Sequence, residues 1–228
     1  ERQRITQLFG RYVSDRVVQR LLESGQPPQL GGEALQVTVL FSDIRNFTTL
    51  SEQLNAEEVV ELLNEYFRRV CEPILANDGT IDKFIGDAVM AHFGWPLHNP
   101  DHADQALRAA IAMQQVAHEF NTWLAQRFGK RAPPAFAIGV GIHSGKVVLG
   151  NIGSPRHMQF TAIGDNVNIA SRLESQTKEF GCGILASADT IAASSGLALT
   201  GRSQSVHLKG RQQPVEVFEI LSLKTESS

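Results

Sequence analysis

The chain has 228 residues, of which 42% are hydrophobic, and its formal net charge is −3. This composition supplies one sizeable hydrophobic core, and the small negative charge argues against nucleic acid as a partner. Cys71 and Cys182 lack cysteine or histidine neighbours at zinc-ligand spacing, and no run approaches the ~18 apolar residues of a membrane span, so we expect a cytoplasmic segment without membrane contact.

An amphipathic helix is expected near the N-terminus, where apolar residues recur at helical spacing between Tyr12 and Glu23. The sequence Ser-Gly-Gln-Pro-Pro, which starts at Ser24, then interrupts this helix. We therefore expect residues 1–33 to form a helical connecting arm outside the core and, from the start at Glu1, the whole chain to be a segment of a longer protein.

A largely apolar strand from Val37 to Phe41 is expected to deliver Asp43 to its C-terminal end. A short helix then begins at Asn46, and its first backbone N–H groups could meet an anion. A longer helix follows, capped by Ser51 or Asn55, with one apolar stripe facing the core. Asp43 alone fits a strand-end or helix-capping carboxylate as well as a metal ligand.

Two apolar-rich runs between Thr80 and His92 flank Gly86-Asp87, which predicts a hairpin with this dipeptide at its tip. Lys83 and Asp87 would then hold a cation and a carboxylate on rigid backbone. A solvated hairpin with one surface ion pair explains the same pattern. If Asp87 lies beside Asp43, the two carboxylates could instead hold two Mg²⁺ ions next to a phosphate group.

A second long helix is expected from Ala106 to Phe128, with Asp101 as its cap. The glycine-interrupted run from Phe136 to Ile152 predicts a bent pair of strands that turns at residues 143–146. Strands and helices then intermix without a strict βαβ rhythm, which predicts an α+β fold with helices packed on one face of a sheet. The remaining expected elements are strands at 159–163, 183–185, 205–208 and 215–221 and helices at 165–175 and 187–192.

Asn168 and Arg172 lie four residues apart in the predicted helix that Asp165 opens, so they project from the same face. The planar arginine fork suits phosphate oxygens, although a solvated arginine with a contact one turn away explains the spacing too. Lys146 and Lys209 each lie beside glycine, where an ammonium could reach a triphosphate, but each alone is typical of a surface lysine.

Four motifs, in this order, resemble the catalytic domain of the class III nucleotidyl cyclases. They are Phe41-Ser-Asp-Ile-Arg-Asn-Phe-Thr, Lys83-Phe-Ile-Gly-Asp87, Gly139-Val-Gly-Ile-His-Ser-Gly-Lys and Ile163-Gly-Asp-Asn-Val-Asn-Ile-Ala-Ser-Arg172. The resemblance covers residues 34–222, which leaves 1–33 as the arm and 223–228 as a tail. It implies a ferredoxin-like α+β fold and a homodimer, in which one chain provides the metal site and the other the purine and transition-state residues.

The resemblance also implies the role of each residue at these positions. Asp43, Asp87 and the Ile44 carbonyl would bind two Mg²⁺ or Mn²⁺ ions per active site. Asn168 resembles the ribose-orienting asparagine and Arg172 the transition-state arginine. The remaining substrate contacts would come from Lys83 and Thr161 at the purine, and from Phe47, Thr48, Lys146 and Lys209 at the phosphates.

Two positions depart from the commoner family pattern. Thr161 replaces an aspartate, as in a subgroup that includes bicarbonate-responsive adenylyl cyclases, and Asn46 occupies a position that is often glycine. The resemblance thus implies an adenylyl cyclase that forms 3′,5′-cyclic AMP and pyrophosphate from ATP in signal transduction, with bicarbonate or CO₂ as an activator. The general base is left open between Asp43, water and substrate phosphate.

Guanylyl cyclase activity is the nearest alternative. Adenine presents an acceptor at N1 and a donor at N6, which match the ammonium of Lys83 and the hydroxyl of Thr161, whereas guanine reverses both polarities. A second alternative is a catalytically silent nucleotide-binding dimerisation module, which would keep the fold but lose catalytic residues. All the key catalytic positions are occupied in this sequence, which argues against that alternative. A polymerase-like or diguanylate cyclase domain shares the paired carboxylates but does not explain Asn168 with Arg172.

Overall fold

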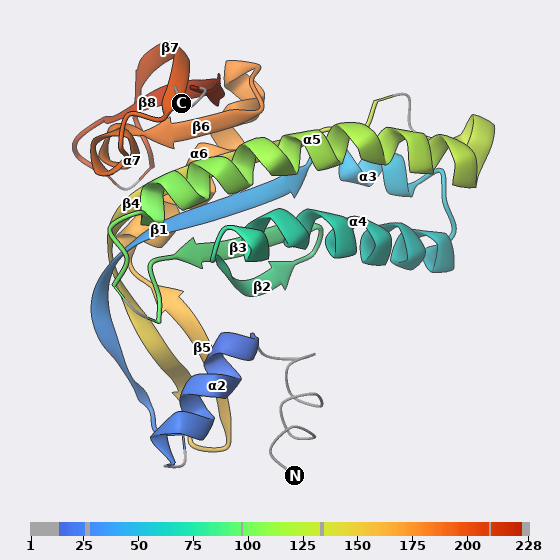
Figure 1. Cartoon of the computed structure of the whole chain (residues 1–228). Coiled ribbons are helices and arrows are strands. Elements are labelled where there is room, and N and C mark those ends of the chain that lie inside the picture. Colours follow the sequence, from blue (N-terminus) through green and yellow to red (C-terminus); the bar gives the residue numbers. More distant parts are fainter. Residues whose placement is uncertain (1–13, 26–27, 97, 133–134, 210, 225–228) are drawn as a thin grey trace.

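The computed structural model describes residues 14–25, 28–96, 98–132, 135–209 and 211–224 (Figure 1). Its centre is a mixed sheet in the order β2-β3-β1-β4-β6-β8-β7, with β5 paired to β4. All strand pairs are antiparallel except β4 with β6, and the α+β class is confirmed. The strands are β1 (Gly31–Ile44), β2 (Thr80–Ile85), β3 (Ala88–Phe93), β4 (Ile138–Ser154), β5 (His157–Ile163), β6 (Ile184–Ser187), β7 (Ala198–Val206) and β8 (Val215–Leu223).

Helices cover both faces of this sheet. In β1, Leu40 packs with the cluster that contains the two long helices, while its neighbours Val39 and Phe41 pack with α2 and α6 on the opposite face. The expectation of helices on one face is therefore wrong, because β1 is apolar on both faces and each face needs a cover. The helices are α2 (Asp15–Ser24), α3 (Phe47–Ser51), α4 (Ala56–Ala76), α5 (His102–Phe128), α6 (Asp165–Phe180) and α7 (Ala188–Ala193), with a 3₁₀ turn at Gly129–Arg131.

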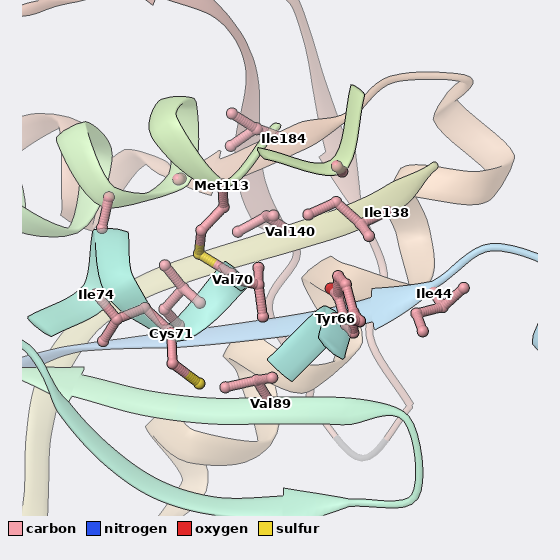
Figure 2. Packing of buried hydrophobic residues seen from close by; sticks show 14 of the residues in the cluster. Ile44, Tyr66, Val70, Cys71, Ile74, Val89, Met113, Ile138, Val140 and Ile184 are labelled. Carbon is pink, nitrogen blue, oxygen red and sulfur yellow. The ribbon is translucent and has the colours of Figure 1, made fainter. Parts of the chain in front are cut away.

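The start of α4 confirms one of the two expected caps. Asn55 Oδ1 accepts a bond from the Glu58 amide at 2.9 Å, and Glu58 Oε2 accepts one from the Asn55 amide at 3.1 Å. This reciprocal capping satisfies amides that the first helical turn leaves unpaired. The helix then buries Leu62, Tyr66, Val70 and Ile74, and Figure 2 shows the last three facing the centre of the core.

The predicted turn at residues 143–146 does not exist, because β4 continues through it and pairs with the whole length of β1. The glycines in this run serve close packing instead. A side chain at Gly141 would collide with the α6 backbone at Ala170 and Glu174, and one at Gly145 would collide with Asn166. Glycine here lets α6 lie directly on the strand, which the sequence pattern alone could not distinguish from a turn.

The expectation that the arm lies outside the core is wrong, because its described part packs on the sheet and β1 already begins at Gly31. Val17 and Val18 of α2 are buried, and Arg16 pairs with Asp78 Oδ1 at 2.9 Å. The guanidinium of Arg20 lies 5.6 Å from the centre of the Trp95 ring. Tyr12, where the helix was predicted to begin, lies outside the described residues. None of the described helices has the length and apolar content that a membrane crossing requires.

His92 in β3 makes stability depend on pH. Its side chain is fully buried, and burial, with a contribution from Arg16, lowers the pKa of His92 to about 4. Between pH ~6.5 and 4, His92 is therefore protonated in the unfolded chain and neutral in the folded chain. The free energy of unfolding should consequently fall by about 3 kcal/mol as the pH drops to 4. Urea unfolding of wild type and His92→Gln at pH 7 and 4 checks this, because the variant should lose less stability. Equal losses would contradict the assignment.

Candidate active site

Two predicted metal ligands meet at one end of the sheet. Asp43 lies near the end of β1 and Asp87 in the turn between β2 and β3, and the pairing of β1 with β3 brings these segments together. The Ile44 amide lies 2.9 Å from Asp43 Oδ1 and 3.2 Å from Asp87 Oδ2, so one backbone N–H donates to both carboxylates. Gly86 in the same turn has a φ of 62°, which confirms the predicted tight hairpin.

The pair has the electrostatics of a cation site. Burial, the neighbouring Asp87 carboxyl and the more distant Glu174 raise the pKa of Asp43 to about 8. A divalent cation would relieve this repulsion, and carboxylate and carbonyl oxygens are the ligands that Mg²⁺ prefers. No group of three or more acidic, histidine or cysteine side chains suited to a metal occurs among the described residues. The residues therefore fit a cation held by two carboxylates and the Ile44 carbonyl, with further ligands from water or substrate.

The loop after Asp43 has a backbone conformation that explains Asn46. This residue has φ 53° and ψ 37°, in the left-handed region where glycine is easiest and asparagine is tolerated. Phe47 and Thr48 then open α3; Phe47 packs partly against the core and Thr48 is exposed. Arg45 is used structurally, since its guanidinium donates to Thr177 Oγ1 at 2.6 Å.

A second cluster joins β2 to β5. The predicted purine-binding residues Lys83 and Thr161 both contact Asp82, a residue that the sequence analysis missed. Thr161 Oγ1 lies 2.9 Å from Asp82 Oδ1, and Lys83 Nζ lies 3.6 Å from the same oxygen. The register of β2 against β3 shifts between Ile81 and Lys83, so Asp82 is an extra residue in the strand. Such a bulge changes side-chain direction, and simple alternation would have separated Asp82 from Lys83.

Asn168 and Arg172 are not assembled with the carboxylate pair of the same chain. Both lie on α6, where Asn168 is exposed and Arg172 is half-buried, and neither has a hydrogen bond or ion pair with Asp43 or Asp87 within the described segments. Glu174 is the α6 residue that interacts electrostatically with the pair. Arg172 lies two residues earlier, roughly 200° around the helix, so it projects away from that side.

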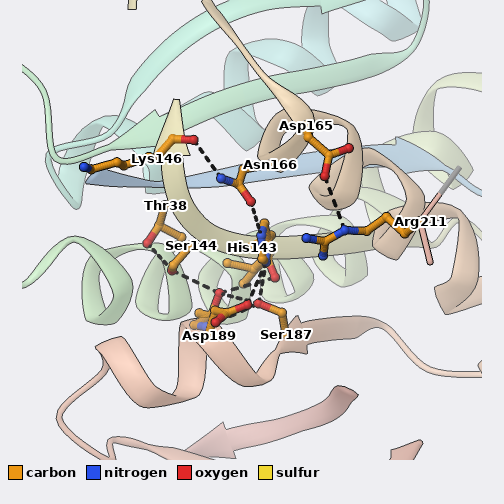
Figure 3. A network of polar contacts seen from close by, with 11 residues as sticks. Thr38, His143, Ser144, Lys146, Asp165, Asn166, Ser187, Asp189 and Arg211 are labelled. Atoms are coloured by element: carbon orange, nitrogen blue, oxygen red, sulfur yellow. Dashed lines mark hydrogen bonds and ion pairs between the residues drawn. The ribbon is translucent and has the colours of Figure 1, made fainter. Parts of the chain in front are cut away.

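The two predicted phosphate-binding lysines are exposed. Neither ammonium forms an ion pair with another residue that the structure describes. The Lys146 carbonyl accepts a bond from Asn166 Nδ2 at 2.7 Å, and Figure 3 shows its side chain directed away from the polar network below it. Lys146 and Lys209 are thus accessible to a ligand, but one chain does not bring them to the carboxylates.

A buried polar network positions the first turn of α6 (Figure 3). His143 Nε2 lies 2.8 Å from Asn166 Oδ1, and Nδ1 lies 2.7 Å from Ser187 Oγ. Because an amide oxygen only accepts, Nε2 carries the proton and Ser187 donates to Nδ1. The network connects β4 and the start of α7 to Asn166 in α6, two residues before Asn168. The His143 motif thus orients a helix rather than forming a turn.

Comparisons with known proteins match this fold and these motifs. The model of the adenylate and guanylate cyclase catalytic domain matches residues 32–222. Adenylate cyclase 1 of Rhizobium meliloti (strain 1021) is 38% identical over 218 residues, covering 94% of this chain and 32% of that protein, so the chain spans about a third of this relative's length. The crystal structure of the guanylyl cyclase Cya2 superposes with a TM-score of 0.78 at 35% identity, covering 86% of this chain and 96% of that one. The adenylyl cyclase CyaB from P. aeruginosa gives 0.76 at 34% identity, covering 87% and 100%.

Proposed function

Because the chain belongs to the family of adenylate and guanylate cyclase catalytic domains, we propose that it is an adenylyl cyclase that converts ATP into 3′,5′-cyclic AMP and pyrophosphate. The similar structures include a guanylyl cyclase, so substrate choice must be argued from the site. The observation that supports ATP as the substrate is the cluster on β2 and β5, where the ammonium of Lys83 can donate to adenine N1 beside the hydroxyl of Thr161. We assign catalysis to residues 34–222, with 1–33 as connecting arm and 223–228 as tail.

The reaction is an intramolecular displacement. The ribose 3′-oxygen forms a bond to the α-phosphorus, the bond from the α-phosphorus to the bridging oxygen breaks, and pyrophosphate leaves. The proton of the 3′-hydroxyl passes to Asp43, a water molecule or a substrate phosphate. Asn168 holds the ribose in line, and Arg172 donates to charge that develops on the phosphate in the transition state.

Asp43, Asp87 and the Ile44 carbonyl would hold two Mg²⁺ or Mn²⁺ ions. When bound, such ions lower the pKa of the 3′-hydroxyl and neutralise the leaving pyrophosphate. Phe47 and Thr48 would contribute backbone N–H groups to the phosphates. Lys146 and Lys209, both exposed, would add positive charge there.

The site is shared between two chains in this proposal. Support comes from Arg172, which projects away from the carboxylate pair of its own chain. Apolar side chains also remain exposed near both clusters, namely Phe84 and Ile85 on β2 and the cross-strand pair Val148 and Ile163 on β4 and β5. Exposed apolar surface of this kind is typical of an interface, and a homodimer would cover it with a second copy.

Product identification tests the function. Purified protein incubated with ATP or GTP and Mg²⁺ or Mn²⁺ should form cyclic AMP and much less cyclic GMP. Predominant cyclic GMP would make the protein a guanylyl cyclase, and a folded protein without either product would be a silent nucleotide-binding module.

The free thiols Cys71 and Cys182 suit the reducing cytoplasm, where ATP is available for signalling. Activation by bicarbonate stays a prediction that rests on Thr161 and the family resemblance.

Lys83→Glu should reduce ATP use and permit GTP use. The substitution replaces a donor that faces N1 with an acceptor, which suits the N1–H of guanine, and one reversed polar contact should shift the ATP to GTP preference in kcat/KM by roughly 10- to 100-fold. Initial rates with both nucleotides measure the shift. Lys130→Glu, the same charge change at an exposed lysine outside the proposed site, is the matched control. An unchanged preference in Lys83→Glu would show that Lys83 does not read the purine.

A further inference from the structure

Thr161 alone does not distinguish adenine from a 6-oxopurine. A hydroxyl has one proton to donate and two lone pairs that accept, so it can face either the amino group of adenine or the carbonyl of guanine. The direction of its hydrogen bond must be set by a neighbour. This question rests on the proposed function, because it concerns the purine that the cyclase site binds.

Asp82 is placed to set that direction. Its side chain has 0% exposure, and its Oδ1 and Oδ2 lie 2.9 and 3.1 Å from Thr161 Oγ1. The Ala162 amide donates to Oδ2 at 3.0 Å, and Lys83 Nζ lies 3.6 Å from Oδ1. Burial raises the pKa of Asp82, but three donor groups converge on this one carboxylate and oppose that shift, which favours the ionised, acceptor-only side chain.

The Thr161 hydroxyl must therefore donate to Asp82. Its single proton is then engaged on the side away from the substrate, and only lone pairs are left for a ligand. We infer that Asp82 is a positioning residue for purine selection, which makes Thr161 an obligatory acceptor and so favours a purine with an amino group at C6 over one with a carbonyl.

Asp82 also acts on Lys83, the second member of the cluster. The ammonium of Lys83 lies 3.6 Å from Asp82 Oδ1, and its remaining protons can point to an unprotonated N1. A 6-oxopurine presents a carbonyl to the lone pairs of Thr161 and an N1–H to the ammonium of Lys83. Both contacts are then repulsive, so one carboxylate sets the polarity of the whole recognition edge.

The β-bulge makes this arrangement possible. In a regular strand, Asp82 and Lys83 would point to opposite faces of the sheet. The extra residue at Asp82 lets both side chains reach the β5 side, where Thr161 and Ala162 lie. Selectivity is thus built into the backbone of β2 as well as into side-chain identity.

Asp82→Asn is the sharpest test because the amide keeps the shape of the carboxylate but replaces one acceptor with a donor. Thr161 can then accept from the amide and turn its own proton toward a purine carbonyl. We would measure kcat and KM with ATP and with inosine triphosphate, which differ only at N1 and C6. The ratio of kcat/KM for ATP to that for inosine triphosphate should fall about 10- to 100-fold, the effect of one mispaired polar group.

Asp78→Asn is the matched control. Asp78 precedes β2, pairs with Arg16 at 2.9 Å and has an exposed side chain, so the same chemical change there should leave the ratio at its wild-type value. The Mn²⁺ concentration for half-maximal rate should be unchanged in Asp82→Asn. A general loss of structure would change this value and the rates with both nucleotides together, whereas lost purine selection changes only their ratio.

If Asp82→Asn does not fold, a second pair of variants tests the inference. Thr161→Ser keeps the hydroxyl and should keep the ratio, while Thr161→Val removes the oriented acceptor and should lower it. If the wild type is active and Asp82→Asn or Thr161→Val keeps the wild-type preference for ATP over inosine triphosphate, the inference is overturned and the cyclase assignment stays intact. A wild type that cyclises neither nucleotide would overturn both.

Discussion

Asp87→Asn protein should form cyclic AMP at roughly one hundredth of the wild-type rate or less, because a neutral amide in place of one carboxylate leaves the charge of the proposed cations uncompensated. Asp43→Asn should have the same effect. Both variants should keep the fold, since the two side chains lie at the end of a strand and in a turn rather than in the core.

Although Asp87→Asn should lower activity, it should raise the thermal stability of the protein when divalent cations are absent. Between pH ~4 and 8, folded wild type holds a proton on Asp43 that the unfolded chain has released, because the pKa of Asp43 rises from 3.8 to about 8. Wild-type stability therefore falls as the pH rises through this window. Asp87→Asn removes one cause of the raised pKa, so at pH 8 its melting temperature should exceed that of wild type by roughly 2–4 °C per kcal/mol of relieved repulsion.

Thermal melts with and without Mn²⁺, together with cyclic AMP assays, check both effects. Mn²⁺ should raise the melting temperature of wild type but hardly that of Asp87→Asn. Asp101→Asn is the control, because Asp101 precedes α5 without a capping bond from its side chain and should behave like wild type in both assays. Near-normal metal-dependent turnover in Asp43→Asn or Asp87→Asn would remove these residues from the proposed metal site.

Mixing two inactive proteins, Asp87→Ala and Arg172→Ala, should restore cyclic AMP formation. If each site takes its carboxylates from one chain and its arginine from the other, a heterodimer has one site with both defects and one with neither. Random exchange at equal amounts makes half of the dimers mixed, and half of their sites are intact. Two-fold symmetry thus predicts about a quarter of wild-type activity.

The matched control is a mixture of Asp43→Ala and Asp87→Ala. These residues serve the same side of the site, so each site of that heterodimer lacks one carboxylate and no activity should return. Pull-down of a tagged partner verifies that chains exchange. Verified Asp87→Ala and Arg172→Ala heterodimers without recovered activity would mean that each site draws both residues from one chain.

Elements with local causes could be predicted from the sequence. The hairpin tip at Gly86-Asp87 depends on one glycine in a left-handed conformation, and the start of α4 depends on contacts between Asn55 and Glu58, three residues apart. Both kinds of signal lie within a few residues. The motif around Asp43 and that around Asp87 also predicted correctly that two carboxylates would meet, although their metal role stays a prediction.

Elements whose cause is distant in the sequence could not be predicted. The glycines of β4 resembled turn residues, but Gly141 lies under the α6 backbone and Gly150 lies against the backbone of β1, where a side chain would collide. The second face of β1 is covered by α2 and α6, which come from parts of the chain far from each other. The bulge that turns Asp82 toward Thr161, 79 residues away, depends on the register between β2 and β3.

Hydrophobic period, capping residues and motif spacing act over short stretches of chain, so the amino-acid sequence was enough to predict the α+β class, the order of most elements and the set of candidate side chains. The family motifs already implied that Asp43 meets Asp87, that Lys83 and Thr161 share the purine and that Arg172 serves the carboxylates of another chain. The tertiary structure added Asp82, which lies between Lys83 and Thr161, and the direction in which Arg172 projects from α6. Strand register and the rotation of α6 fix these relations, and both result from packing between residues far apart in the chain.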